Sequence, residues 1–200
     1  MKLDTMSGLK RTDYCGTLTI DKIGETVVVC GWAARQRDLG QLIFIDLRDR
    51  TGIVQLAFDD TTDREIFSKA FQVRSVYVLM AKGTVRKRSS VNPDIPTGEI
   101  EIEVTELKVL GSAETTPFEI LDDTSVKEEL RLKYRYLDLR RPTLQNNLVM
   151  RHKVTKVTRD FFDGEGFLEI ETPTLIKSTP EGARDYLVPS RIHKGSFYAL

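Results

Sequence analysis

The first hundred residues alternate apolar and polar positions with the two-residue period of β-strands. Strands are predicted over 27–32, 41–47, 53–58 and 76–85, and a fifth starts after Gly98, where Ile100, Ile102 and Val104 alternate with Glu99, Glu101 and Glu103. Residues 49–52 (DRTG) form a turn, so the second and third strands should make a hairpin. Helical spacing over 63–74 adds a helix between the third and fourth strands. This order is that of an OB-fold, a small barrel that often binds oligonucleotides.

The pattern changes after Gly111, where residues 111–123 are polar and suggest a hinge. A helix is predicted from Pro142 to Gly164, because Met150 begins an apolar stripe that continues at offsets of four, seven and eleven. Residues 167–172 read as a strand that Pro173 closes.

Three parts are therefore expected, with an α+β class overall. They are a barrel over 1–110, a hinge with a short helix over 111–142, and the start of a second domain over 143–200. The surfaces on which that second domain would pack are expected to lie outside this chain. Apolar side chains after Pro142 should consequently be exposed.

Composition narrows the function only slightly. Thirty basic and thirty acidic residues cancel, so attraction to nucleic acid must come from local patches. The longest apolar run, 27–34, is far short of the roughly 20 residues that span a bilayer. The N-terminus lacks the apolar stretch of a signal peptide, and we expect a cytoplasmic protein without membrane contact. Cys15 and Cys30 suit small buried side chains, and the isolated His152 and His193 suggest no metal site.

The predicted barrel carries candidate residues for nucleic-acid binding. Basic residues gather on its strands and turns at Arg35, Arg37, Arg48, Arg50, Lys82, Arg86, Lys87 and Arg88. Phe44 alternates with core residues, and either stacks on a base or fills a second apolar face. Gln55 either pairs with a base edge or faces solvent, and Glu101 either accepts from base amino groups or belongs to a solvated face.

A charged loop follows Pro173. Glu181 and Asp185 invite comparison with the paired carboxylates of glycosidases, but a loop fixes no distance between them and no sugar cleft is evident. Glu181 is better suited to a ligand ammonium group, and Arg184 to a carboxylate or phosphate.

Three strings together resemble one family. They are CGWAARQRDLGQLIFIDLRDRTGIVQL at 30–56, RLKYRYLDLRRP at 131–142 and GFLEIETPTLIKSTPEGARDYLVPSR at 166–191. In this order they resemble the aspartyl-tRNA synthetases of the bacterial type, which are class II aminoacyl-tRNA synthetases. Asparaginyl and lysyl enzymes share the architecture, but the wording Gly182 to Tyr186 favours aspartate.

The resemblance implies roles for individual residues. Those matching the anticodon-binding positions are Arg37, Phe44, Gln55, Arg86, Arg88, Asn92 and Glu101, with Phe44 stacking under the central base. Glu181 matches the residue that helps hold the amino group of aspartate, within a flipping loop that includes Gly182, Arg184 and Asp185. Pro173 matches motif 1 of the dimer interface, and Leu39 resembles enzymes restricted to tRNA-Asp.

The implied reaction joins L-aspartate to tRNA-Asp with ATP and Mg²⁺ in a homodimer. The motifs that clamp ATP would lie beyond Leu200, so no catalytic residue and no metal ligand is expected within this chain, which should be inactive alone. The alternative is a stand-alone OB-fold module that binds tRNA or single strands without ligase activity.

Overall fold

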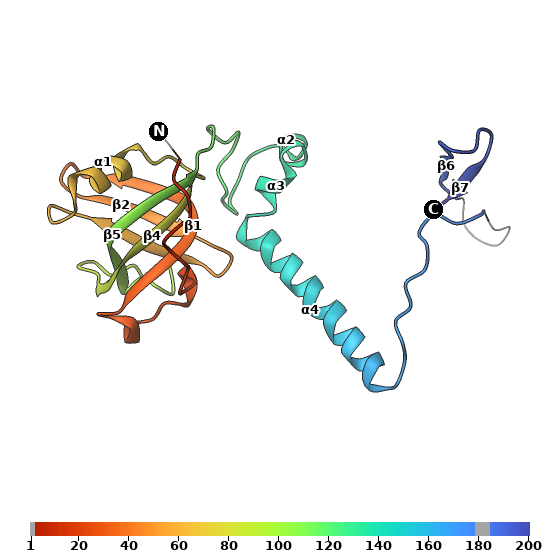
Figure 1. Cartoon of the computed structure of the whole chain (residues 1–200), viewed down its shortest axis with the longest axis horizontal. Coiled ribbons are helices and arrows are strands. Elements are labelled where there is room, and N and C mark those ends of the chain that lie inside the picture. Colours follow the sequence, from red (N-terminus) through yellow and green to blue (C-terminus); the bar gives the residue numbers. More distant parts are fainter. Residues whose placement is uncertain (1–2, 179–184) are drawn as a thin grey trace. The chain divides into compact units, whose positions relative to one another are not determined.

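The computed structural model (Figure 1) describes residues 3–178 and 185–200. The chain divides into two compact units, Met1–Glu119 and Ile120–Leu200. The finer division into a barrel, a hinge and the start of a catalytic domain stays a prediction.

The first unit is a closed five-stranded barrel with strand order β1-β2-β3-β5-β4. The strands are β1 Thr26–Asp38, β2 Ile43–Arg48, β3 Ile53–Phe58, β4 Val78–Lys87 and β5 Ile100–Gly111. β1 pairs with both β2 and β4, which closes the barrel, and only β3 and β5 run parallel. The predicted OB-fold is confirmed.

One helix lies between β3 and β4, where the helical spacing predicted it. This is α1, Arg64–Gln72, and the side chain of Asp63 caps it by accepting from the backbone N–H groups of Glu65 and Ile66. Two short 3₁₀ turns, Cys15–Thr17 and Ile20–Lys22, precede β1.

Alternate strand residues point into the barrel and form its core. The fully buried members include Val27, Val29, Ile43, Ile45, Leu47, Leu56, Leu79, Ile100 and Ile102. Each large side chain of this kind contributes about 1.5–3 kcal/mol relative to exposure. The residues between them necessarily point outward, and these build the candidate site.

A buried carboxylate fastens the N-terminal segment to the β2–β3 turn. Asp49 accepts from the backbone N–H of Cys15 at 2.7 Å, and from both the N–H and hydroxyl of Thr51 at 2.7 and 2.6 Å. Burial alone would raise the pKa of Asp49, but the hydrogen bonds from Thr51 and Cys15 outweigh it and lower that pKa. A Cβ on Gly16 would approach the Thr51 carbonyl oxygen to 2.2 Å, so only glycine fits there.

The second unit contains the helices α2 Glu128–Lys133, α3 Arg135–Asp138 and α4 Pro142–Gly164, followed by the short strands β6 Leu187–Pro189 and β7 Phe197–Ala199. Asp138 is fully buried, and its carboxylate accepts from Arg135 and Arg141 and also faces Arg131. Three cations thus stabilise one buried charge. Of the helices in residues 3–178 and 185–200, none is both long and apolar enough to cross a membrane.

The predicted strand at 167–172 is wrong, because these residues form no strand in the structure. A strand needs a neighbouring backbone to pair with. In the described residues β6 and β7 pair with each other, and the isolated bridge to β7 comes from Ile176. The expected exposure after Pro142 is confirmed: Met150, Val154 and Phe161 on α4 are 62%, 58% and 62% exposed.

Candidate nucleic-acid interface

Three of the predicted residues and the unpredicted Asp46 share one face of the barrel because of how its strands pair. Asp46 on β2 lies opposite Gln55 on β3, Gln55 lies opposite Glu101 on β5, and Glu101 lies opposite Arg86 on β4. We call these four residues the polar row. Arg37 on β1 lies opposite Phe44, in the next row of the same face.

Side-chain hydrogen bonds connect the polar row, with Arg37 joining Asp46 to Gln55. The Arg37 Nη2 group donates to Asp46 Oδ1 and to Gln55 Oε1, both at 2.8 Å. Gln55 Nε2 donates to Glu101 Oε2 at 2.6 Å, and Arg86 Nε donates to Glu101 Oε1 at 2.8 Å. The predicted residues Arg37, Gln55, Glu101 and Arg86 therefore form one connected group.

Gln55 and Glu101 are buried, with exposed fractions of 3% and 6%. The solvent-facing alternative for Gln55 and the solvated-face alternative for Glu101 are therefore both wrong in the structure. Buried polar groups of this kind are stable only when hydrogen-bonded, as both are here. Their partners orient them toward each other and toward the two arginines.

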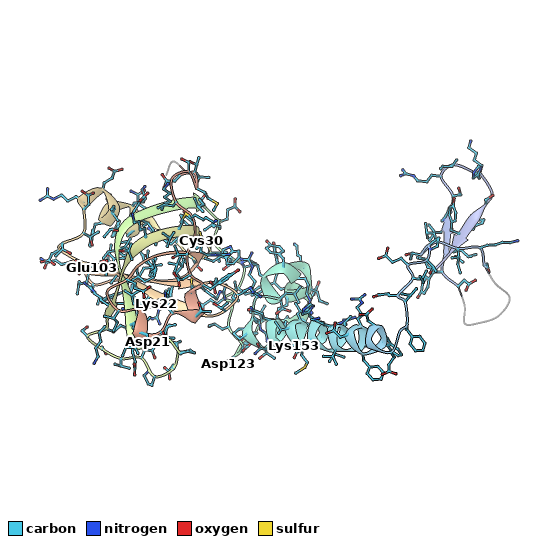
Figure 2. The ribbon with its side chains drawn as sticks, turned by 60° about the horizontal axis from the view of Figure 1, so that its bottom comes forward. Asp21, Lys22, Cys30, Glu103, Asp123 and Lys153 are labelled. Carbon is cyan, nitrogen blue, oxygen red and sulfur yellow. The ribbon has the colours of Figure 1, made fainter. Side chains whose placement is uncertain are left out.

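Arg86 forms ion pairs with three carboxylates. It contacts Glu101, Asp59 at 3.0 Å and Glu103 at 3.2 Å, and Figure 2 labels Glu103 on the barrel. Burial alone would lower the pKa of Arg86, but hydrogen bonds to Glu101 and Asp59 raise it overall, so the guanidinium stays charged. Two guanidiniums thus face four carboxylates, since Asp46 pairs with Arg37.

Phe44 is half-buried beside this group. Its ring centroid lies 5.6 Å from the Arg37 guanidinium carbon, within the range of a cation–π contact. The residue opposite it on β3 is the small Ala57. An aromatic ring next to hydrogen-bonding side chains is the arrangement on which single-stranded bases stack.

Arg88 and Asn92 lie in the loop after β4 and have no side-chain bond to the polar row among the described residues. Arg88 donates its backbone N–H to Glu99, and its buried Nε has no hydrogen-bond partner in the described part of the chain. Asn92 shapes the loop, because its side-chain oxygen accepts from the backbone N–H of Asp94 at 3.0 Å. A Cβ on Gly98 would approach the Asn92 carbonyl oxygen to 1.7 Å, which requires glycine.

The other predicted residues belong to the second unit. Pro173 is exposed, and Asp185 accepts from the Ser178 hydroxyl at 2.6 Å. Glu181, Gly182 and Arg184 lie outside the described residues. Among the residues that are described, no group of three or more His, Cys, Asp or Glu side chains could hold a metal ion.

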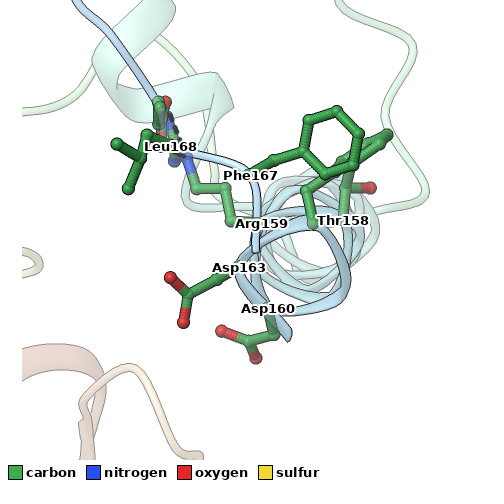
Figure 3. Close-up of a pocket in the computed structure, with 8 residues that line it drawn as sticks. Thr158, Arg159, Asp160, Asp163, Phe167 and Leu168 are labelled. Atoms are coloured by element: carbon green, nitrogen blue, oxygen red, sulfur yellow. Dashed lines mark hydrogen bonds and ion pairs between the residues drawn. The ribbon is translucent and has the colours of Figure 1, made fainter. Parts of the chain in front are cut away.

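A groove at the end of α4 contains none of the predicted residues (Figure 3). The chain turns back there beside the helix, and Arg159 forms an ion pair with Glu169 at 2.8 Å. The groove is lined by Thr158, Arg159, Asp160, Phe162, Asp163, Phe167, Leu168 and Glu169. Its lining mixes aromatic and charged side chains.

Sequence reasoning missed Asp46, Asp59 and Glu103. A signal existed for Asp46, which alternates with the core residues Ile45 and Leu47 and so must point outward beside Phe44. Asp59 gave no signal, because it follows the end of β3 and reaches Arg86 only through the fold of the barrel.

Comparison with known proteins supplies the family. A model described as "OB-fold nucleic acid binding domain" matches residues 27–110, and one described as "tRNA synthetases class II (D, K and N)" matches residues 127–200. The aspartate–tRNA(Asp/Asn) ligase of Thermoanaerobacter pseudethanolicus is 60% identical over 199 residues, which are 98% of this chain and 34% of that protein. The chain is similar to the aspartyl-tRNA synthetases over almost its whole length. Its predicted resemblance is confirmed.

Other aspartate–tRNA ligases are almost as similar. The aspartate–tRNA ligase of Ruminiclostridium cellulolyticum is 58% identical over 98% of this chain and 33% of its own length. The chain spans about a third of the length of the curated relatives it matches. Asparaginyl-tRNA synthetase from Pyrococcus horikoshii, solved with asparaginyl-adenylate, superposes with a TM-score of 0.78 at 24% identity, covering 96% of this chain and 42% of that one. This similarity concerns the fold alone.

Proposed function

We propose that this chain belongs to an aspartate–tRNA ligase and that its barrel recognises the anticodon of tRNA-Asp. One observation supports this most directly: five of the seven residues matching anticodon-binding positions lie on one barrel face, where Arg37, Gln55, Glu101 and Arg86 are hydrogen-bonded together beside Phe44. The match of residues 127–200 to class II synthetases disfavours a stand-alone OB-fold module.

The face offers the three kinds of contact that a single-stranded anticodon requires. Phe44 stacks against the central base, while the more exposed Arg37 and Arg86 offer N–H donors to base edges. The buried Gln55 and Glu101 hold these two guanidiniums in place. Arg88 supplies positive charge for a phosphate, and Asn92 adds a polar contact from its loop. Because much of the charge on this face is compensated internally, hydrogen-bond pattern rather than net charge selects the RNA.

The whole enzyme activates L-aspartate with ATP and Mg²⁺ and transfers it to tRNA-Asp, in the cytoplasm and as a homodimer. Glu181 helps to hold the aspartate amino group, the flipping loop with Gly182, Arg184 and Asp185 closes over it, and Pro173 belongs to the dimer interface. The described residues do not fit a Mg²⁺ site, because they contain no group of three or more His, Cys, Asp or Glu side chains that could hold the ion. We expect no aspartate-dependent ATP–pyrophosphate exchange by the purified chain; measurable exchange would contradict this.

A second acceptor, tRNA-Asn, is favoured by the relatives named for both tRNAs. Leu39, 67% exposed in the turn before β2, instead resembles enzymes restricted to tRNA-Asp. The two anticodons differ only in their last base, so comparing them tests whether the barrel distinguishes that single base.

Titration of the chain with stem-loops carrying the aspartate anticodon, the asparagine anticodon and an unrelated anticodon tests the proposal. Salt is held fixed, because phosphate contacts alone respond strongly to it. Anticodon recognition requires the aspartate stem-loop to bind at least tenfold tighter than the unrelated one. Equal affinities for all three would refute it. The asparagine stem-loop binds like the aspartate one only if both tRNAs are acceptors.

A further inference from the structure

Two carboxylates that match no anticodon position hold the two arginines of the face. Asp46 Oδ1 accepts from Arg37, and Asp59 Oδ2 accepts from Arg86. Both carboxylate side chains are less exposed than the arginines they hold: 23% against 34% for Asp46 and Arg37, and 13% against 33% for Asp59 and Arg86. The guanidiniums are therefore the more accessible partner in each pair.

Asp59 is itself fixed in place. Its second oxygen accepts from the backbone N–H of Thr61 at 3.1 Å and from the Thr61 hydroxyl at 2.6 Å. The Thr61 hydrogen bond, followed by that of Arg86, lowers the pKa of Asp59 despite its burial. Both oxygens of this carboxylate are thus occupied before any ligand arrives, and Arg86 is held against a rigid support.

The chemistry of the row leaves Gln55 only one orientation. A carboxylate can only accept and a guanidinium can only donate, so the amide must turn its NH₂ toward Glu101 and its oxygen toward Arg37. Arg37 reaches Gln55 through the same nitrogen that Asp46 holds. Without the Asp46 carboxylate the Arg37 guanidinium can turn away, and Gln55 then loses the hydrogen bond that orients its amide.

We propose that Asp46 and Asp59 are positioning residues for anticodon recognition, acting through Arg37 and Arg86 and not by contact with RNA. This inference rests on the proposed function of the barrel. In the free protein the two carboxylates fix the guanidinium donors that the bases meet. Fixing these donors beforehand avoids an ordering cost when RNA binds.

The sign of the effect separates positioning from plain electrostatics. Neutralising a carboxylate near bound RNA reduces repulsion and strengthens binding to every sequence. Loss of a positioning carboxylate has the opposite effect on the cognate RNA and leaves other RNAs nearly unchanged. Asp60 provides the matched control, because it is exposed, adjacent to Asp59 and forms no hydrogen bond or ion pair with a described residue.

The experiment compares Asp46→Asn, Asp59→Asn and Asp60→Asn in the full 200-residue chain. Each is titrated with the aspartate anticodon stem-loop and with stem-loops changed at one anticodon base, at one salt concentration. Asp46→Asn and Asp59→Asn should bind the cognate stem-loop about tenfold more weakly, and the ratio of cognate to changed affinities should fall about as much. Asp60→Asn should leave that ratio unchanged.

Thr61→Val is the second variant, in case either aspartate change prevents folding. Thr61 is exposed, and the substitution removes only the hydroxyl that donates to Asp59. It should lower the ratio of cognate to changed affinities about threefold. Unchanged ratios in the folded variants, or tighter cognate binding, would overturn the positioning role while leaving anticodon recognition intact. A wild-type chain that binds all the stem-loops alike would refute anticodon recognition, and the positioning role with it.

Discussion

Gln55→Glu places a new carboxylate against an existing one and leaves the shape of the side chain almost unchanged. Gln55 Nε2 lies 2.6 Å from Glu101 Oε2. Two carboxylate charges about 3 Å apart repel by about 5 kcal/mol at an effective dielectric constant near 20. The folded protein avoids part of that cost by keeping a proton on the introduced group, which then donates to Glu101 as the amide did.

The cost of that proton sets the size of the effect. An ordinary glutamate has a pKa of about 4.3, so keeping it protonated at pH 7 costs about 3.7 kcal/mol. The cost of protonation is lower than the repulsion between two carboxylates, so the introduced group stays protonated. Its hydrogen bond from Arg37 offsets part of that cost. We expect Gln55→Glu to reduce the free energy of unfolding by about 2–4 kcal/mol at pH 7.

The pH dependence follows from the direction of the pKa shift. The introduced carboxyl has a higher pKa when folded than when unfolded, so the folded state binds the extra proton. Stability of the variant is therefore close to wild type near pH 4 and falls as the pH rises through the folded pKa. At pH 5 the difference should be about 1 kcal/mol.

Urea denaturation followed by Trp32 fluorescence measures this, because Trp32 is the only tryptophan of the chain and lies on β1 of the barrel. Gln41→Glu is the matched control, since it makes the same chemical change at an exposed position before β2 and should stay within about 0.5 kcal/mol of wild type. A Gln55→Glu variant as stable as wild type at pH 7, or one whose deficit is equal at pH 5 and pH 7, would refute the hydrogen-bonded row.

Three further predictions follow from other contacts. Asp49→Asn should lower the free energy of unfolding by about 2 kcal/mol at pH 7, because it weakens one buried and two partly buried hydrogen bonds. The pKa of Asp49 is lowered by folding, so its contribution is present above about pH 4 and lost as pH falls through the folded pKa; a deficit that persists in acid would contradict this. Phe44→Ala should weaken binding of the aspartate stem-loop by about 1–3 kcal/mol in a fluorescence titration. The melting temperature of the variant protein should be nearly that of wild type. Val154→Lys should make the chain more monomeric in analytical ultracentrifugation without altering barrel stability, because Val154 belongs to the exposed apolar stripe of α4. Association that persists in the variant would show that the chain associates through another surface.

The sequence predicted the barrel well because alternation and turn chemistry are local signals. Ile43, Ile45 and Leu47 alternate with outward residues over β2, and the structure places all three in the core. The polar row was beyond such signals. Gln55 meets Glu101 through the parallel pairing of β3 with β5, across 46 residues of sequence. A polar residue in a strand reads as solvent-facing until its neighbour in space is known.

The wrong strand at 167–172 has a complementary cause. Its residues have strand-forming composition, but pairing depends on a neighbouring backbone, and the described residues provide none there. The family resemblance identified Arg37, Gln55, Glu101 and Arg86 as a set without showing that they touch. Their carboxylate supports Asp46 and Asp59 became visible only once the register of the strands was known.

Exchange of anticodons between two tRNAs tests the central claim most directly. The affinity of the chain is measured for tRNA-Asp, for an unrelated tRNA, and for each of them carrying the other's anticodon, at one near-physiological salt concentration. Anticodon recognition by the barrel predicts that tight binding follows the aspartate anticodon into the unrelated tRNA and is lost from tRNA-Asp. Affinity that stays with the tRNA body, whatever its anticodon, would contradict the account.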